Sequence, residues 1–154
     1  MEDRSPFTHI LVPTDGSEPS IHAGRLAIRI ASTHGVPVTF VYVIDTITTE
    51  RMASATRKPI ETINEELRSK AQNYLDYLTR LAYSRGLETD QVILQGVPHT
   101  EIANLARERR VDLIVIAMAS SHGPHRVDIG SVSRRVIESA PCPVLVVRYT
   151  PSRQ

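Results

Sequence analysis

The apolar residues of this chain gather in five short runs, separated by longer segments with helical spacing. The runs are rich in valine and isoleucine and mostly do not alternate with polar residues. They are HILV (9–12), VPVTFVYVI (36–44), QVILQ (91–95), DLIVIAM (112–118) and PVLVVR (143–148). Continuous apolar runs of this length are typical of strands buried on both faces, as in a parallel sheet. The pattern therefore predicts five strands.

Four of the intervening segments place apolar residues three and four positions apart, as amphipathic helices do. These segments cover residues 17–34, 59–84, 100–110 and 131–140. Ser17 is suited to cap the first helix and Gly35 to end it. In the fourth helix we expect Val132, Val136 and Ile137 to be buried.

Residues 45–59 (DTITTERMASATRKP) are the one long stretch that we predict to be irregular, as a surface loop or, alternatively, a mobile lid. Elsewhere strand and helix alternate. We therefore expect residues 1–154 to form a single α/β domain with an open, doubly wound parallel sheet and helices on both faces. Ligands of such sheets bind beyond the carboxyl ends of the strands, where the strand order reverses.

Composition narrows the class of protein. The chain has 154 residues, of which 41% are apolar and 23% charged, and a net charge of +1, so no strong field favours nucleic acid or a membrane surface. No apolar run reaches the roughly 20 residues of a membrane helix. Cys142 is the single cysteine, which excludes an internal disulfide, and the opening MEDRSPFTHI has no apolar signal core. We expect a cytoplasmic protein.

Two strand ends carry candidate binding groups. Asp15 follows the first strand in VPTDGSEPS, where its side chain either forms a tight turn or offers a carboxylate to a base, a ribose hydroxyl or a bound metal. Val43 lies near the end of the second strand, where its amide and carbonyl groups are placed to pair with an adenine edge.

The stretch after the fourth strand is a candidate anion site. Gly130 and Ser131 open a helix, whose free amides and dipole favour a negative group. Arg126, and His122 and His125 when protonated, can add positive charge nearby. The two histidines have no evident carboxylate or cysteine companions, so a metal site formed by the protein alone is not expected there.

These segments resemble the universal stress protein family over nearly the whole chain. The resemblance is carried by HILVPTDGSEPS (9–20), VYVID (41–45), GVPHTEI (96–102), DLIVIA (112–117) and GSVSRRVIESAPCPVLVVR (130–148). It implies a five-stranded sheet in the order 3-2-1-4-5, and a homodimer formed through the last strand, 143–148. It also implies binding of ATP, or of ADP or AMP, with magnesium or manganese.

The resemblance also assigns a set of binding residues. It implies that the adenosine contacts Pro13, Thr14, Asp15 and Val43, and that the phosphates contact Ala117, Met118, Ser120, Ser121, Gly123, Gly130, Ser131, Val132 and Ser133. Asp15 is the candidate to reach a metal carried by the nucleotide.

The phosphate loop departs from the pattern of the family's ATP-binding members, which have a glycine, a second three positions on, and a third ten positions beyond it. Counted back from Gly130 without gaps, the first two positions hold Ala117 and Ser120. A gapped alignment would instead match SSHG (120–123) to the segment that holds the first two glycines of the family's pattern. If the loop needs a positive φ at Ser120, its Cβ costs about 1–2 kcal/mol. A hydroxyl donated to phosphate returns about 1 kcal/mol, so we expect retained but weaker nucleotide binding.

Two other functions compete with this interpretation. Efficient catalysis would need a nucleophile and base, or paired carboxylates, in the cleft, and Asp15 is the one acid that the sequence places there. At most, slow ATP hydrolysis is expected. The second alternative is a dimeric interaction module of the same fold that binds no nucleotide, because PVLVVR (143–148) is a candidate apolar edge strand.

Overall fold

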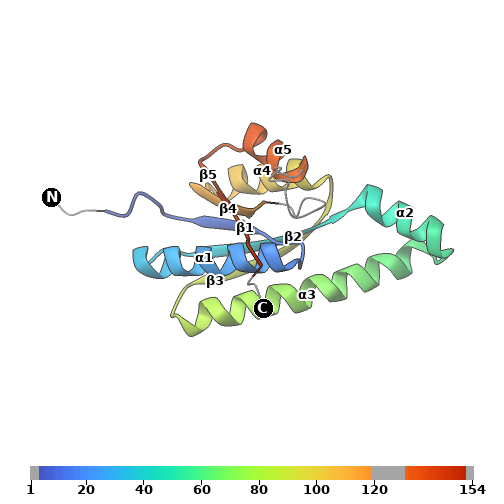
Figure 1. Cartoon of the computed structure of the whole chain (residues 1–154), viewed down its shortest axis with the longest axis horizontal. Helices are drawn as coiled ribbons and strands as arrows, with labels where there is room; N and C mark the ends of the chain where they lie inside the picture. Colours follow the sequence, from blue (N-terminus) through green and yellow to red (C-terminus); the bar gives the residue numbers. More distant parts are fainter. Residues whose placement is uncertain (1–3, 119–130, 152–154) are drawn as a thin grey trace.

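The computed structural model describes residues 4–118 and 131–151 (Figure 1). Strands and helices alternate along the chain, with one additional helix after the second strand. In order, the elements are β1 (Ile10–Pro13), α1 (Glu18–His34), β2 (Val38–Asp45), α2 (Thr46–Thr56), α3 (Ile60–Ser84), β3 (Thr89–Gly96), α4 (Pro98–Glu108), β4 (Leu113–Ala117), α5 (Ser131–Ser139) and β5 (Val144–Val147). All five predicted strands and all four predicted helices are present.

The five strands form one parallel sheet in the order β3-β2-β1-β4-β5, which confirms the predicted fold class and strand order. The strand order reverses at β1, which pairs with β2 on one side and with β4 on the other. Pro13, the last residue of β1, is in register with Val41 of β2. The carboxyl ends of β1, β2 and β4 therefore meet at one edge of the sheet, where the prediction places a ligand.

Helices cover both faces of the sheet. Helices α1 and α3 pack on one face, where Ala27 and Leu75 contact the side of the sheet that carries Phe40. Helices α4 and α5 pack on the other face, where Ile102 lies against the side that carries Ile114. Figure 1 shows the two pairs on opposite sides of the strands. This double coverage explains the continuous apolar runs of β1 and β4, all of whose residues are buried.

The edge strands β3 and β5 are less buried than the central ones. Each has neighbours on one side only, and most of their residues are partly exposed. Leu145 of β5 is 38% exposed. Full burial on both faces, expected from the apolar runs, thus holds for the centre of the sheet and fails at its edges.

The predicted ends of the first helix are confirmed. Ser17 is the N-cap of α1, and its hydroxyl accepts a hydrogen bond from the amide of Ser20 at 3.3 Å. Gly35 follows the helix with a φ of 66°, a left-handed conformation that costs glycine little. The cap also fixes where the chain turns from β1 into α1, on the ligand side of the sheet.

The irregular loop predicted for residues 45–59 is wrong, because most of this segment forms helix α2. The helix begins where the Asp45 carboxylate accepts hydrogen bonds from the amide of Ile47 at 3.0 Å and from the hydroxyl of Thr48 at 3.2 Å. Its one buried residue is Thr49, so no apolar stripe marks it in the sequence. Local capping, together with packing along α3, forms this helix (Figure 1).

The expected burial of α5 is correct for one residue and wrong for two. Val136 is fully buried against the sheet, whereas Val132 is 39% exposed and Ile137 is 42% exposed. The helix has nine residues and packs mainly beside α4, and only a narrow stripe of it, Ser133 and Val136, is buried.

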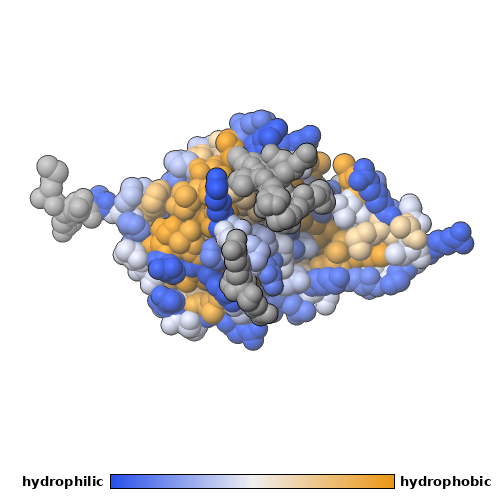
Figure 2. All heavy atoms as spheres, in the orientation of Figure 1, coloured by the Kyte–Doolittle hydropathy of each residue, from blue (hydrophilic) through white to orange (hydrophobic). Residues whose placement is uncertain are grey.

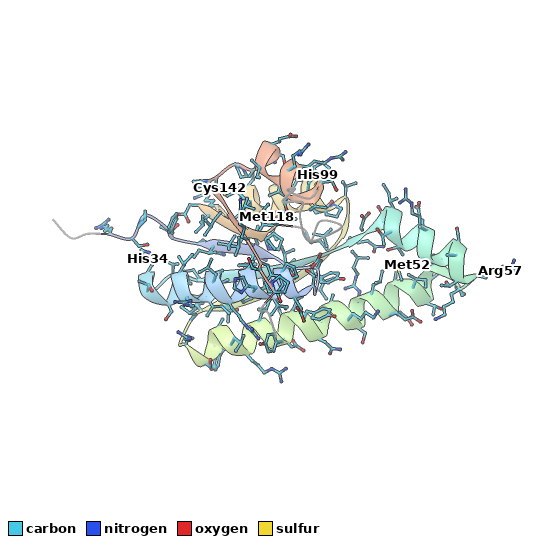
Figure 3. All side chains as sticks on the ribbon, viewed as in Figure 1. His34, Met52, Arg57, His99, Met118 and Cys142 are labelled. Carbon is cyan, nitrogen blue, oxygen red and sulfur yellow. The ribbon has the colours of Figure 1, made fainter. Side chains whose placement is uncertain are left out.

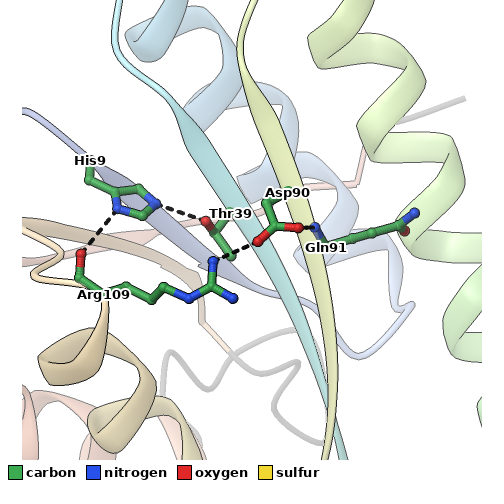
Figure 4. A network of polar contacts seen from close by, with 5 residues as sticks. All are labelled: His9, Thr39, Asp90, Gln91 and Arg109. Atoms are coloured by element: carbon green, nitrogen blue, oxygen red, sulfur yellow. Dashed lines mark hydrogen bonds and ion pairs between the residues drawn. The ribbon is translucent and has the colours of Figure 1, made fainter.

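A polar network closes the opposite, amino edge of the sheet (Figure 4). One ring nitrogen of His9 lies 2.8 Å from the hydroxyl of the buried Thr39, and the other lies 3.3 Å from the carbonyl of Arg109. The guanidinium of Arg109 forms an ion pair with Asp90 at 2.6 Å. The network joins β2, β3 and the end of α4, far from the carboxyl ends of the strands.

Candidate functional site

A cavity of about 460 Å³ lies at the carboxyl ends of β1, β2 and β4. Its volume is within the range of small-molecule sites, about 300–1,000 Å³. Every predicted binding residue that the structure describes lines it: Pro13, Thr14, Asp15, Val43, Ala117, Met118, Ser131, Val132 and Ser133. Ser120, Ser121, Gly123 and Gly130 lie outside the described residues. The structure thus brings four separate stretches of the chain, 13–15, Val43, 117–118 and 131–133, together around one space.

The turn after β1 forms one wall of this cavity. The amide of Thr14 donates to the carbonyl of Val41 at 2.8 Å, and its hydroxyl lies 2.9 Å from that of Ser20. Asp15 accepts a hydrogen bond from the amide of Ser17 at 2.9 Å, so the turn-forming role considered for Asp15 is present. Asp15 is nevertheless exposed and lines the cavity, which leaves its carboxylate accessible to a ligand.

Gly16 is required in this turn for two reasons. Its φ is 81°, which residues with a side chain rarely adopt, and a Cβ at this position would overlap the ring of Tyr74 on α3. The ring of Tyr74 therefore packs directly against the backbone of the turn at Gly16. The position of Asp15 follows from this close packing between its neighbour and α3.

The electrostatics of this wall involve Tyr42 as well as Asp15. Burial raises the pKa of Tyr42, and the negative charge of Asp15 and the nearby Tyr74 raise it further. The Tyr42 phenol therefore stays protonated and is available as a hydrogen-bond donor at neutral pH. Tyr42 lines the cavity and was not predicted from the sequence as a site residue.

The end of β2 offers a backbone edge to the cavity. The last bond from β1 is donated by Thr14 to the carbonyl of Val41, and β1 ends at Pro13. Backbone groups two residues further along a strand point to the same side again. The N–H and C=O of Val43 therefore point to the β1 side of β2, into the space beyond the end of β1. This donor–acceptor pair is the arrangement expected for recognition of an adenine edge.

The start of α5 forms the opposite end of the cavity. Ser131, Val132 and Ser133 are its first three residues, whose amides have no acceptor within the helix. The buried hydroxyl of Ser133 donates to the carbonyl of Ala117 at 2.8 Å and so ties α5 to the end of β4. Ser133 is thus placed to contribute its amide to an anion, rather than its hydroxyl.

Several lining residues were missed in the sequence, and Asp45 is the most informative. Asp45 ends β2, and Thr48 lines the cavity from the first turn of α2. An acid just beyond the end of a predicted strand is the signal that singled out Asp15, and Asp45 in VYVID, directly after the run 36–44, carries the same signal. Leu67 and Pro98 reach the cavity from α3 and α4, and no sequence signal marks them.

Other candidate chemistry is limited in the described residues. Within residues 4–118 and 131–151, no three His, Cys, Asp or Glu side chains form a group suited to a metal ion. Burial raises the pKa of the Cys142 thiol, which packs with the apolar cluster under α4 and α5. None of the described helices is both long enough and apolar enough to span a bilayer.

Comparison with known proteins places this arrangement in a family. Residues 6–148 match the model of the universal stress protein family. Universal stress protein MJ0531 of Methanocaldococcus jannaschii is 35% identical over 142 residues, which cover 92% of this chain and 82% of that protein.

Solved structures agree with that match. The structure of the hypothetical protein MJ0577, also from M. jannaschii, superposes with a TM-score of 0.81 at 25% identity and covers 96% of this chain and 100% of that one. A universal stress protein from Archaeoglobus fulgidus in complex with dAMP has a TM-score of 0.67 at 24% identity and covers 92% of this chain and 98% of that one. The chain belongs to the universal stress protein family.

Proposed function

We propose that this protein binds an adenine nucleotide, with ATP as the expected ligand, and acts as a nucleotide-dependent regulatory module in a stress response. The observation that carries the proposal is one cavity that joins two complementary ends. One end is the backbone edge of Val43, and the other is the start of α5 at Ser131. An adenine nucleotide has a base that suits the first and an anion that suits the second.

At the base end, the orientation of the groups favours adenine. The Val43 amide donates to the ring nitrogen N1, and its carbonyl accepts from the 6-amino group. Guanine and hypoxanthine carry a hydrogen on N1 and an oxygen at position 6, so they present the reverse pattern. The sugar then lies over the ends of β1 and β4, beside Thr14 and Asp15.

At the other end, the phosphates lie against the first turn of α5. The amides of Ser131, Val132 and Ser133 and the helix dipole favour a negative group there. A magnesium or manganese ion carried by the phosphates would have Asp15 as its ligand from this chain. ADP and AMP share the adenosine contacts and lose part of the phosphate contacts. The dAMP complex of the Archaeoglobus relative supports an adenine nucleotide as the ligand class.

Isothermal titration with ATP and magnesium tests the proposal, and α5 offers a matched pair of variants. Ser131→Glu places a negative charge where the phosphates bind, yet an acid in the first helical turn does not destabilise the helix. Ser131→Gln has nearly the same size without the charge. We expect binding by the wild type, weaker binding by at least about tenfold in Ser131→Glu, and near wild-type binding in Ser131→Gln. Absence of heat and of a thermal shift at millimolar ATP contradicts the proposal.

A second candidate function is that of a dimeric module, and the exposed edge of β5 favours it. The sheet ends at β5, and Leu145 is 38% exposed on it, so a second copy can pair with this strand. Sedimentation analysis of Leu145→Lys tests this interface, because a charge on an edge strand opposes pairing. A wild-type dimer that becomes a monomer in Leu145→Lys supports it, and a wild-type monomer contradicts it. ATP released on denaturing the purified protein would favour nucleotide binding over a module without ligand.

A further inference from the structure

Asp45 both lines the cavity and caps helix α2. It is the last residue of β2 and lines the cavity together with Thr48. Its carboxylate oxygens accept hydrogen bonds from the amide of Ile47 and the hydroxyl of Thr48, at 3.0 Å and 3.2 Å. A carboxylate has about four lone-pair sites, so these two bonds leave it able to accept a further donor.

Helix α2 depends on this residue because, apart from its packing along α3, it buries little of its own surface. Its one buried residue, Thr49, donates its hydroxyl to the backbone carbonyl of Asp45 at 2.9 Å. At its other end, Arg57 has a φ of 57°, which is unfavourable for a residue with a side chain. Figure 3 shows Arg57 at the tip of the arm formed by α2 and α3, well away from Met118 of the cavity. Apolar side chains lie along this arm (Figure 2), and Ile47 is 52% exposed.

The direction of β2 places the base relative to Asp45. Along any strand, the carbonyl of a residue follows its amide, so the Val43 carbonyl lies on the side of Asp45. If N1 of adenine accepts from the Val43 amide and the 6-amino group donates to the Val43 carbonyl, the 6-amino group is the part of the base nearest to Asp45. Its second hydrogen then remains free to be donated to another acceptor.

We propose that Asp45 is a base-selecting residue of the nucleotide site, whose carboxylate accepts a hydrogen bond from the 6-amino group while it holds the first turn of α2. This inference rests on the proposed nucleotide binding and adds to it. A base with an oxygen at position 6 would bring two acceptors together at Asp45. Binding of the amino base also fixes the carboxylate in its capping position and thereby stabilises α2.

Titration of the full-length protein with ATP and with ITP, each with magnesium, tests the selection. ITP has an oxygen at position 6 and is otherwise the same ligand. In Asp45→Asn the cap is kept, because asparagine is an equally good N-cap residue, and the amide can turn its donor toward that oxygen. We expect Asp45→Asn to bind ITP more tightly than the wild type does. The ratio of ATP affinity to ITP affinity should therefore fall by about tenfold.

Arg57→Gly is the matched control at the other end of the same helix. Glycine relieves the left-handed conformation without touching the cavity, so the ATP-to-ITP ratio stays at the wild-type value. Hydrogen exchange of the 46–56 amides provides a second readout. ATP slows exchange there in the wild type, and the effect of ATP is smaller in Asp45→Asn.

The outcomes separate the two proposals. Binding of ATP with an unchanged ATP-to-ITP ratio in Asp45→Asn overturns the inference, reduces Asp45 to a helix cap and leaves the proposed function intact. No binding of either nucleotide by the wild type overturns the proposed function and this inference with it. A lower ATP-to-ITP ratio in Asp45→Asn, together with slower exchange of the α2 amides when the wild type binds ATP, supports both proposals.

Discussion

The hydroxyl of Ser133 donates a buried hydrogen bond of 2.8 Å to the carbonyl of Ala117. The two residues stand on either side of the 119–130 segment, one at the end of β4 and the other in the first turn of α5. The bond therefore fixes how the start of α5 faces the end of the sheet. This is the relationship on which the proposed phosphate site depends.

Loss of this bond should reduce both stability and nucleotide affinity. In Ser133→Ala the Ala117 carbonyl is left buried without its donor, which costs about 1–3 kcal/mol. We expect the free energy of unfolding, measured by urea titration, to fall by that amount. We also expect weaker ATP binding in isothermal titration. Ser139→Ala is the control on the same helix, because the Ser139 hydroxyl bonds the Arg135 carbonyl in an exposed position. An equal loss in both variants would contradict a special role for Ser133.

The turn that presents Asp15 should tolerate no side chain at position 16. Gly16→Ala introduces a Cβ at a φ of 81° and into the ring of Tyr74. Gly35→Ala introduces a Cβ at a φ of 66°, where no atom lies within 4 Å. The control therefore measures the backbone cost, about 1–2 kcal/mol, and we expect Gly16→Ala to lose more than that in thermal or urea unfolding. Equal losses would show that the packing against Tyr74 is unimportant.

Acid should weaken the fold in part through Asp112. Burial raises the pKa of this carboxyl, but hydrogen bonds from Thr8 and His9 outweigh burial, and the pKa lies below its ordinary value. A lowered pKa contributes stability above the ordinary value of about 3.9, and this is lost as the pH falls through the lower, folded-state value. Urea midpoints measured from pH 6 to pH 2 should fall less steeply in Asp112→Asn. Identical slopes would be evidence against this contribution.

Ser120→Gly addresses the glycine pattern of the family, and the prediction comes from the sequence alone. If the loop needs a positive φ at position 120, a glycine there removes the cost of the serine Cβ, and we expect tighter ATP binding by up to about tenfold in titration. Unchanged or weaker binding would mean that the serine hydroxyl contributes more than its backbone costs.

Much of the site was predictable because its positions follow from the fold. Residues at the carboxyl ends of β1 and β4, such as Thr14 and Ala117, lie together in any sheet with this strand order. Asp45 was missed as a site residue because the helix that it caps was read as a loop. The predicted burial of Val132 and Ile137 was wrong, because apolar spacing does not reveal how narrow the buried stripe of a short helix is.

The position of the nucleotide is the central claim, and amide chemical shifts report it directly. The measurement is a nuclear magnetic resonance titration of the ¹⁵N-labelled protein with ATP and magnesium. The account predicts the largest shifts at Asp15, at Val43 and at the first turn of α5, from Ser131 to Ser133. It predicts little change at the amino edge of the sheet, around Asp90. An absence of shifts at millimolar ATP, or shifts confined to the amino edge, would contradict the account.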